Sequence, residues 1–218
     1  MRKKKMKCIF FNRPDKYQQQ LFEQCYEIIN DALTTGYCNP DNDFYSFPKI
    51  SVNPHAYTQG GPRRYVTATS HYVVEWAAQK GIPLIFKWDD SNAVRYEYAE
   101  RYKVIADKQG IDLSAIDHQL MILVNFNEDS QKAKEETRAF ISDYVSEMHP
   151  DENLEKKLEE IITENAVGDY KECIATAKLA IEKCGAKGVL LSFEPMNDLM
   201  SQKNTIDIVD VNIKKYHM

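Results

Sequence analysis

The stretch NPHAYTQGGPRRYVTATSHYVVEWAAQKGIPLIFKW, residues 53–88, decides the fold. It predicts a strand over 64–69, a helix over 70–80 and a second strand over 83–88, which the turn Gly81-Ile82-Pro83 joins to the helix. The first strand enters the helix through Thr69-Ser70, so hydroxyl groups lie where the carboxyl end of a strand meets a helix N-terminus. Parallel α/β proteins bind ligands, and phosphates especially, at such places. The stretch predicts one βαβ unit and a candidate phosphate site.

The same alternation of strands and helices continues along the chain. Further helices are predicted over 15–35, 91–108, 130–148, 154–164 and 170–183, with a last one carrying Ile206, Val209, Ile213 and Tyr216. Two apolar runs, 119–125 and 188–193, are typical of strands buried on both faces. Because no linker or low-complexity segment interrupts the pattern, we expect a single α/β domain over 1–218 with a parallel sheet. Four strands are predicted, whereas a closed (β/α)₈ barrel needs eight.

Composition excludes several classes of protein. A chain of 218 residues with 43% hydrophobic and 28% charged residues suits one globular domain, or part of a larger one. A net charge of −5 without a basic stripe argues against nucleic-acid binding, and no apolar run is long enough for a membrane span or a signal peptide, so we expect a cytoplasmic protein. The five cysteines include no CxxC pair and have no histidine nearby. We therefore expect reduced structural thiols and no metal site.

Four long segments carry a resemblance to a known family. They are FFNRPDKYQQQLFEQCYEIINDALTTGYCNPDNDFYSFPKISVNPHAYTQGG (10–61), YVTATSHYVVEWAAQKGIPLIFKWDDS (65–91), IDHQLMILVN (116–125) and LLSFEPMNDLMSQKN (190–204). They closely resemble bacterial luciferase, the alkanal monooxygenase of luminous bacteria, and its beta chain in particular. The beta chain is favoured over the alpha chain because 160–173 passes directly from helix to helix, with no long mobile insertion. Val73, which cannot donate to a phosphate, also departs from the alpha-chain pattern.

The resemblance implies a function and a set of partners. The family is an αβ heterodimer of TIM-like barrels that oxidises reduced FMN and a long-chain aldehyde with O₂, giving a carboxylic acid and light. It implies that this chain is the accessory, non-catalytic beta subunit of a flavin-dependent monooxygenase, with FMN bound mainly by the alpha chain. The resemblance begins at roughly the fourth βα unit of the barrel. We therefore expect a partial TIM-like (β/α)₈ barrel with its first units missing, including helices of the αβ interface and, in the alpha chain, the reactive cysteine and histidines.

Two other interpretations remain. One is a short, non-enzymatic flavin-binding protein of the luciferase type, which is expected to lack different elements of the barrel from this chain. The other is a gene remnant without activity. An open half barrel exposes the edges of its first and last strands, so we expect the chain to emit no light alone and to dimerise or aggregate.

The candidate site residues each have a structural alternative. Thr69 and Ser70 are the candidates for a contact with the flavin or its phosphate. The alternative, that Ser70 caps its helix, is favoured because Val73 departs from the phosphate-binding pattern of the family. The resemblance makes Tyr45 a contact to the alpha chain's mobile lid, and the alternative is packing within its own chain. We expect structural roles for Glu194, His71 and His118, and the acidic pair Asp89-Asp90 fits the charge preference of a helix N-terminus. No catalytic residue is predicted.

Overall fold

The computed structural model describes residues 15–193, 195 and 203. These residues belong to two compact units, one ending at Arg63 and the other beginning at Arg64, and each unit is described on its own. The predicted last helix, with Ile206 and Val209, and the predicted structural residue Glu194 lie outside the described residues. The single domain over 1–218 stays a prediction.

The first unit is a helix followed by a small hairpin. Helix α1 (Asp15–Thr35) ends at Gly36, whose φ of 76° is the left-handed conformation that glycine adopts without strain. Strand β1 (Tyr37–Cys38) then pairs antiparallel with β2 (Ile50–Ser51). The predicted bounds of α1 are confirmed. The helical spacing of Leu21, Cys25, Ile28, Ile29, Ala32 and Leu33 predicts an apolar face on α1. This face is only half-buried, and Ile29 is 55% exposed.

The second unit contains a parallel sheet. Its strands are β3 (Val66–Thr67), β4 (Leu84–Phe86), β5 (Gln119–Phe126), β6 (Ala166–Gly168) and β7 (Gly188–Ser192). Every pairing among them is parallel. Gln119 and Leu120 pair with both β4 and β7, so β5 lies between these two strands. The order β3-β4-β5-β7 therefore forms an open, four-stranded part of a barrel, and β6 pairs with the last residues of β5.

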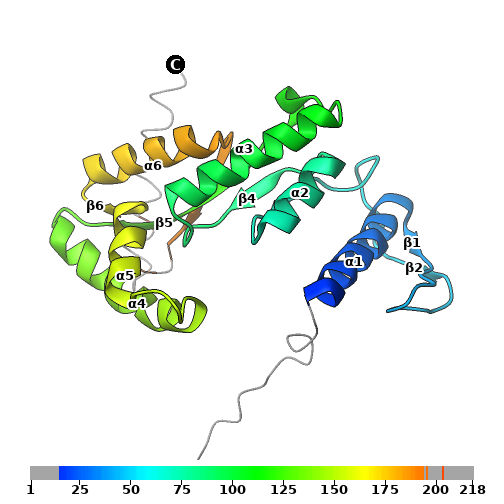
Figure 1. Cartoon of the computed structure of the whole chain (residues 1–218), viewed down its shortest axis with the longest axis horizontal. Coiled ribbons are helices and arrows are strands. Elements are labelled where there is room, and N and C mark those ends of the chain that lie inside the picture. Colours follow the sequence, from blue (N-terminus) through cyan, green and yellow to red (C-terminus); the bar gives the residue numbers. More distant parts are fainter. Residues whose placement is uncertain (1–14, 194, 196–202, 204–218) are drawn as a thin grey trace, which may run out of the picture. The chain divides into compact units, whose positions relative to one another are not determined.

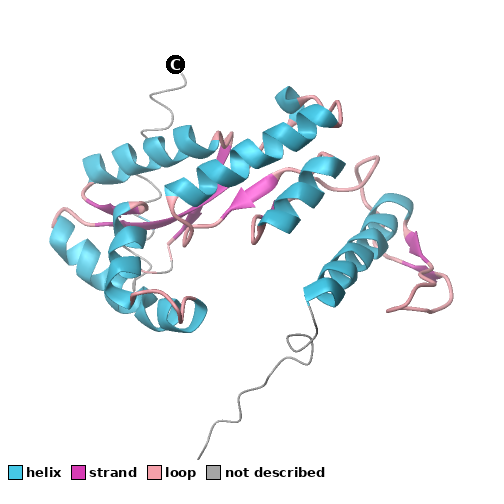
Figure 2. Cartoon of the chain, in the orientation of Figure 1, coloured by secondary structure: helices cyan, strands magenta, loops and turns pink. Residues whose placement is uncertain are grey.

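Helices connect successive strands of this sheet, as the sequence predicts. They are α2 (His71–Lys80), α3 (Asn92–Lys108), α4 (Ser130–Met148), α5 (Leu154–Thr163) and α6 (Tyr170–Cys184), with a short 3₁₀ turn at Leu113–Ala115. Figure 1 shows α3 and α6 side by side along the sheet, and Figure 2 shows that each helix follows a strand through a short loop, except α5, which follows α4. The helix bounds agree with the predicted ones within one residue.

Strand β5 is the centre of the core because both of its faces are covered. Leu123 packs with apolar side chains of α4 and α5, including Ile141, whereas Ile122 and Val124 pack against Cys173 of α6. The apolar run QLMILVN (119–125) predicts a strand buried on both faces, and in the structure Ile122–Asn125 are buried.

Three expectations about this unit are wrong. The segment 160–173 does not pass directly from helix to helix, because the buried strand β6 lies within it. A three-residue strand is too short to show a period in the sequence. Strand β7 is not buried on both faces, since Leu190 is 40% exposed. On α4, helical spacing predicts that Phe140 faces inward together with Ala133, Ile141, Tyr144 and Val145, but Phe140 is 46% exposed, and Thr137 is buried instead.

Candidate functional site

The carboxyl ends of the parallel strands lie at one edge of the sheet, where barrel enzymes place their active sites. Here the loops at that edge are occupied by helix caps. Ser91, Asp129 and Asp169 accept hydrogen bonds from backbone N–H groups of the helices that follow them. Asp169 and Glu172 complete a capping box at α6. These polar side chains therefore stabilise helix starts, each by about 1 kcal/mol.

The predicted phosphate site lies at the turn from β3 to α2. Ser70 has an extended backbone and its Oγ accepts a hydrogen bond from Val73 N at 3.3 Å, so the alternative role as helix cap is confirmed. Thr69 is exposed beside it. Val73 supplies an apolar side chain in the first turn, where a flavin phosphate would need a donor. The side-chain donors of this turn are therefore a poor fit to FMN, and the predicted contact of Thr69 and Ser70 with the flavin stays a prediction.

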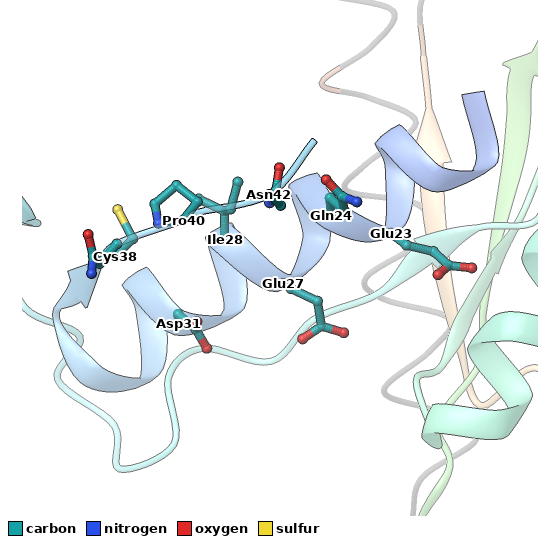
Figure 3. Close-up of a pocket in the computed structure, with 9 residues that line it drawn as sticks. Glu23, Gln24, Glu27, Ile28, Asp31, Cys38, Pro40 and Asn42 are labelled. Atoms are coloured by element: carbon teal, nitrogen blue, oxygen red, sulfur yellow. The ribbon is translucent and has the colours of Figure 1, made fainter. Parts of the chain in front are cut away.

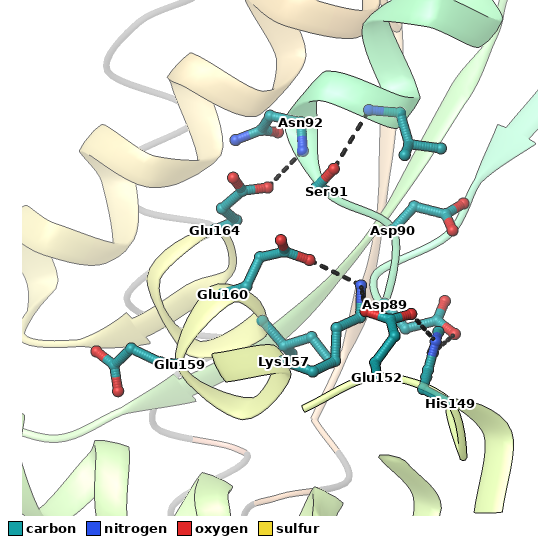
Figure 4. Close-up of polar contacts among 12 residues, drawn as sticks. Asp89, Asp90, Ser91, Asn92, His149, Glu152, Lys157, Glu159, Glu160 and Glu164 are labelled. Atoms are coloured by element: carbon teal, nitrogen blue, oxygen red, sulfur yellow. Dashed lines mark hydrogen bonds and ion pairs between the residues drawn. The ribbon is translucent and has the colours of Figure 1, made fainter. Parts of the chain in front are cut away.

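A buried ionic cluster follows β4, and we call Lys87, Asp89, Asp90, Tyr144 and His149 the Asp89 cluster. Figure 4 shows Asp89, Asp90 and His149 of this cluster. Asp89 is 2% exposed. Its carboxylate accepts from Tyr144 Oη at 2.9 Å and lies 3.2 Å from Lys87 Nζ. His149 Nε2 is 3.4 Å away on the other side. The cluster joins the end of β4 to the carboxyl end of α4.

The two acids of the cluster have opposite pKa shifts. Burial raises the pKa of Asp89, but the charge of Lys87 and the hydrogen bond from Tyr144 outweigh it and leave the pKa lowered. Burial also raises the pKa of Asp90, and the negative charge of Asp89 raises it further. The charge of Lys87 lowers it, but not enough to reverse the rise, so the pKa of Asp90 is raised. One oxygen of Asp90, Oδ2, is buried without a hydrogen-bond partner. Asp89 is thus a fixed anion, and Asp90 is the more easily protonated of the two.

Arg95 fixes the loop that carries these acids. It is fully buried in α3, and its guanidinium donates to Lys87 O and Trp88 O, both at 3.0 Å. A third bond runs to Asn92 Oδ1 at 2.9 Å. Asn165, in the turn before β6, donates to the same Trp88 carbonyl at 2.9 Å. Two buried side chains, Arg95 of α3 and Asn165 after α5, therefore fix the loop after β4 by donating hydrogen bonds to its backbone.

A second set of charges supports the cluster from α5. Lys157, 7% exposed, lies 2.7 Å from Glu160 and 3.8 Å from Glu152. Glu152 in turn lies 2.8 Å from His149 Nδ1, and Glu164 accepts from the backbone N–H of Asn92. The acidic pair predicted to serve a helix N-terminus is therefore part of a larger network. Within the described residues, no three His, Cys, Asp or Glu side chains are arranged to hold a metal ion.

The histidines predicted to be structural have structural contacts. His71 Nε2 lies 2.5 Å from Glu97, and its ring meets Tyr98 edge-on. His118 Nδ1 accepts from Leu84 N at 2.9 Å at the start of β5, the end of the sheet opposite to the Asp89 cluster. Burial lowers the pKa of His118 to about 4, so the ring is neutral at pH 7. Neither histidine lies beside a nucleophile in these contacts.

Tyr45 lies in the first unit, in the loop that follows β1. Asn42 orders this loop because its Oδ1 accepts from Tyr45 N at 2.8 Å. The Tyr45 hydroxyl accepts from Cys25 Sγ of α1 at 3.5 Å, and the side chain is half-buried. Tyr45 therefore packs within its own chain, which is the alternative role given above. Its contact with the mobile lid of an alpha chain stays a prediction.

Helix α1 and the segment 38–42 line an open pocket of about 310 Å³ (Figure 3). Its walls are acidic on the helix side, with Glu23, Glu27 and Asp31, and Cys38 and Pro40 line the loop side. The carboxylates would repel an anionic ligand, so the pocket is unsuited to a flavin phosphate.

Comparison with known proteins gives concordant results. The family described as luciferase-like monooxygenase matches residues 7–182. An alkanal monooxygenase beta chain of Photorhabdus laumondii is 85% identical over 99% of this chain, and this chain spans 66% of that protein's length. A non-fluorescent flavoprotein of Photobacterium phosphoreum is 33% identical over 93% of this chain and 89% of its own length.

Among solved structures, flavoprotein 390 superposes with a TM-score of 0.66 and 30% identity, covering 94% of this chain and 90% of that one. An F420-dependent secondary alcohol dehydrogenase has a TM-score of 0.66 at 14% identity and shares the fold. The long overlap with the short flavoproteins runs against the expectation that they lack different parts of the barrel from this chain.

Proposed function

The chain belongs to the luciferase-like monooxygenase family, and from this premise we propose that it acts as the accessory beta subunit of a bacterial luciferase. In this role it performs no chemistry. It supports an alpha chain that oxidises reduced FMN and a long-chain aldehyde with O₂ and emits light. The observation that carries the proposal is the 85% identity to an alkanal monooxygenase beta chain along almost all of this sequence.

The carboxyl-terminal edge of the sheet supports a non-catalytic role. Ser70 is engaged as a helix cap, and Asp89 is held by Lys87 and Tyr144. A general base must reach the proton that it removes, and Asp89 is too buried and too well paired to do so. In the described part of this edge, the polar groups position loops. We therefore assign reduced FMN to the alpha chain and place the complex in the cytoplasm, in keeping with the free thiols Cys25, Cys38, Cys173 and Cys184.

The proposed contact to the alpha chain is the loop that carries Tyr45. Asn42 and Cys25 hold the tyrosine in a fixed position, so that a partner would meet a pre-ordered aromatic side chain.

A reconstitution assay tests this function. Purified alpha chain of a Photorhabdus luciferase is mixed with this chain, and light is recorded after injection of photoreduced FMN and decanal in aerated buffer. This chain alone is expected to be dark, and the mixture is expected to emit more light than alpha chain alone. Tyr45→Ala should remove most of the gain while Tyr57→Ala, at a fully exposed tyrosine of the same unit, leaves it unchanged. Light from this chain alone, or no gain in the mixture, would contradict the proposal.

A second candidate function is flavin storage without catalysis. It is favoured by the overlap with the non-fluorescent flavoprotein over 89% of that protein's length. Equilibrium dialysis of this chain against FMN distinguishes the two functions. Tight binding that is weakened by Thr69→Val would support flavin storage through the β3–α2 turn, whereas no retention of FMN leaves the accessory role.

A further inference from the structure

His149 lies between two carboxylates at the turn that joins α4 to α5. Its Nδ1 is 2.8 Å from Glu152 Oε1, and its Nε2 is 3.4 Å from Asp89 Oδ2 (Figure 4). The ring is mostly buried, because only 15% of the side chain is exposed. Asp89 belongs to the loop after β4, so the two contacts join separate parts of the second unit at the carboxyl-terminal edge of the sheet.

The two contacts need a proton on each nitrogen of the ring. A neutral imidazole has one N–H, so one of its nitrogens would turn a lone pair toward a carboxylate oxygen. The imidazolium has two N–H groups and can donate to both carboxylates. The backbone favours the same form, since His149 is the C-cap of α4 and cations are stabilised at the carboxyl end of a helix. The geometry therefore fits the protonated ring better than the neutral one.

The charges around the ring also favour a proton. The charged side chains at this site are Lys87, Asp89 and Asp90 from the loop after β4, Glu152 from the turn before α5, and Lys157 and Glu160 from α5. Four carboxylates thus share two ammonium groups, so a proton on His149 offsets half of the excess negative charge. Arg95 of α3 and Glu164 after α5 add one charge of each sign and leave this balance unchanged.

The neighbours of His149 keep their own protonation while a histidine titrates. Burial raises the pKa of Asp89, but Lys87 and Tyr144 leave it lowered overall, so Asp89 stays an anion. Burial raises the pKa of Tyr144, and the charge of Asp89 raises it further, so the hydroxyl keeps its proton and its bond to Asp89. When the ring loses a proton, the shorter contact to Glu152 retains the remaining N–H. The contact to Asp89 is the one that is lost.

We propose that His149 is a proton-operated latch, which ties the α4–α5 turn (149–153) to the loop after β4 when the ring is protonated and releases the turn when the ring is neutral. The loop stays in place in both states, because Arg95 and Asn165 hold its backbone. Glu152 N donates to His149 O at 3.1 Å, so the turn moves as one piece. The latch is closed on the acid side of the range in which histidine titrates and opens as the pH rises. This device goes beyond the accessory function and does not depend on it.

The protonation of the ring is measured by ¹⁵N NMR of the full chain labelled at histidine, with His149→Gln identifying the His149 signals. Both ring nitrogens are expected to show imidazolium shifts at about pH 5.5 and to change together as the pH rises. Glu152→Gln removes one of the two carboxylates and should lower the midpoint of this change by about half a unit. The matched control is Asp151→Asn, at the neighbouring exposed acid, which should move the midpoint less.

The release of the turn is measured by hydrogen exchange of a peptide that contains residues 149–157, in wild type and in His149→Gln. Glutamine has no charge at any pH and imitates the neutral ring. At about pH 5.5 the wild-type peptide should exchange at least about threefold more slowly than the variant, and by about pH 8.5 the two should exchange alike. Circular dichroism confirms that the variants are folded. An exchange ratio that is the same at both pH values, a ring with a single proton at the lower pH, or a midpoint that Glu152→Gln leaves unmoved would each overturn the latch.

Discussion

Removing the guanidinium of Arg95 is expected to destabilise the second unit more than any surface change on the same helix. Arg95 has no exposed surface and donates to three oxygens, those of Lys87, Trp88 and Asn92. In Arg95→Ala the Trp88 carbonyl keeps its bond from Asn165. The Lys87 carbonyl and the Asn92 amide oxygen, whose bonds to Arg95 are part-buried, lose their donor beside the space that the guanidinium leaves.

The size of the effect follows from those two oxygens. Each buried acceptor left without a partner costs about 1–3 kcal/mol, and removing one member of a buried charged network costs about 3–5 kcal/mol. We therefore expect Arg95→Ala to lower the free energy of unfolding by about 3–5 kcal/mol, a large part of the roughly 5–15 kcal/mol available to a domain. Arg95→Lys should recover little, because one ammonium group cannot span three acceptors.

Urea denaturation followed by tryptophan fluorescence measures this loss. The matched control is Arg101→Ala on the same helix, whose guanidinium pairs with Glu75 at the surface and is 44% exposed. An exposed pair of this kind is worth about 0–1 kcal/mol. Equal losses from the two variants, or a loss below about 1 kcal/mol for Arg95→Ala, would refute the reasoning that Arg95 holds the loop after β4.

Three further predictions concern single positions. The pKa of His118 is lowered to about 4 in the folded chain, so the unfolded chain binds the proton first, and the free energy of unfolding should fall by about 2 kcal/mol between pH 7 and pH 5. In His118→Asn that part of the pH dependence should disappear, and an unchanged slope would contradict the assignment. Gly168 has a φ of 133°, so Gly168→Ala should lower the free energy of unfolding, measured by thermal denaturation, by about 1–3 kcal/mol. The loss should exceed that of Gly110→Ala, where an added Cβ meets nothing within 4 Å. A larger loss for Gly110→Ala would be evidence against strain at β6. Burial raises the pKa of Cys173 to about 12, so mass spectrometry after native labelling at pH 8 should find the half-buried Cys25 modified before Cys173, and early labelling of Cys173 would contradict its burial.

The helices of this chain could be predicted from the sequence because their signals are local. Ser70 and Ser91 precede apolar residues at helical spacing and do cap α2 and α3. The central strand could be predicted as readily, since β5 contains the apolar run Leu120–Val124. A long segment that starts with a capping residue, or that is continuously apolar, can therefore be assigned to a helix or a strand from its own residues.

The missed features depend on contacts made far along the chain. Strand β6 has three residues, and it exists because Val124–Phe126 offer it a partner. The exposure of Leu190 is set by what lies beside β7, which an apolar run cannot reveal. The burial of Arg95 was also missed, since a charged residue on a helix is usually solvated. The only signal was its position shortly after Asp89-Asp90, which suggests a charge partner without showing that all three are buried.

In the candidate site, too, local features could be predicted from the sequence and long-range contacts could not. The sequence placed Thr69 and Ser70 correctly at the strand-to-helix turn, and the cap at Ser70 is present. The Asp89 cluster could not be assembled from the sequence, because Tyr144 and His149 lie 55 and 60 residues from Asp89. Side chains that meet across such separations are brought together only by the folded sheet.

The accessory role is tested most directly by the light emitted per mole of alpha chain as this chain is titrated into a fixed amount of it, with saturating reduced FMN and decanal. The account predicts that light rises with added chain and reaches a plateau, and that the chain emits none in the absence of alpha chain. Light that stays at the level of alpha chain alone at every concentration would contradict the account.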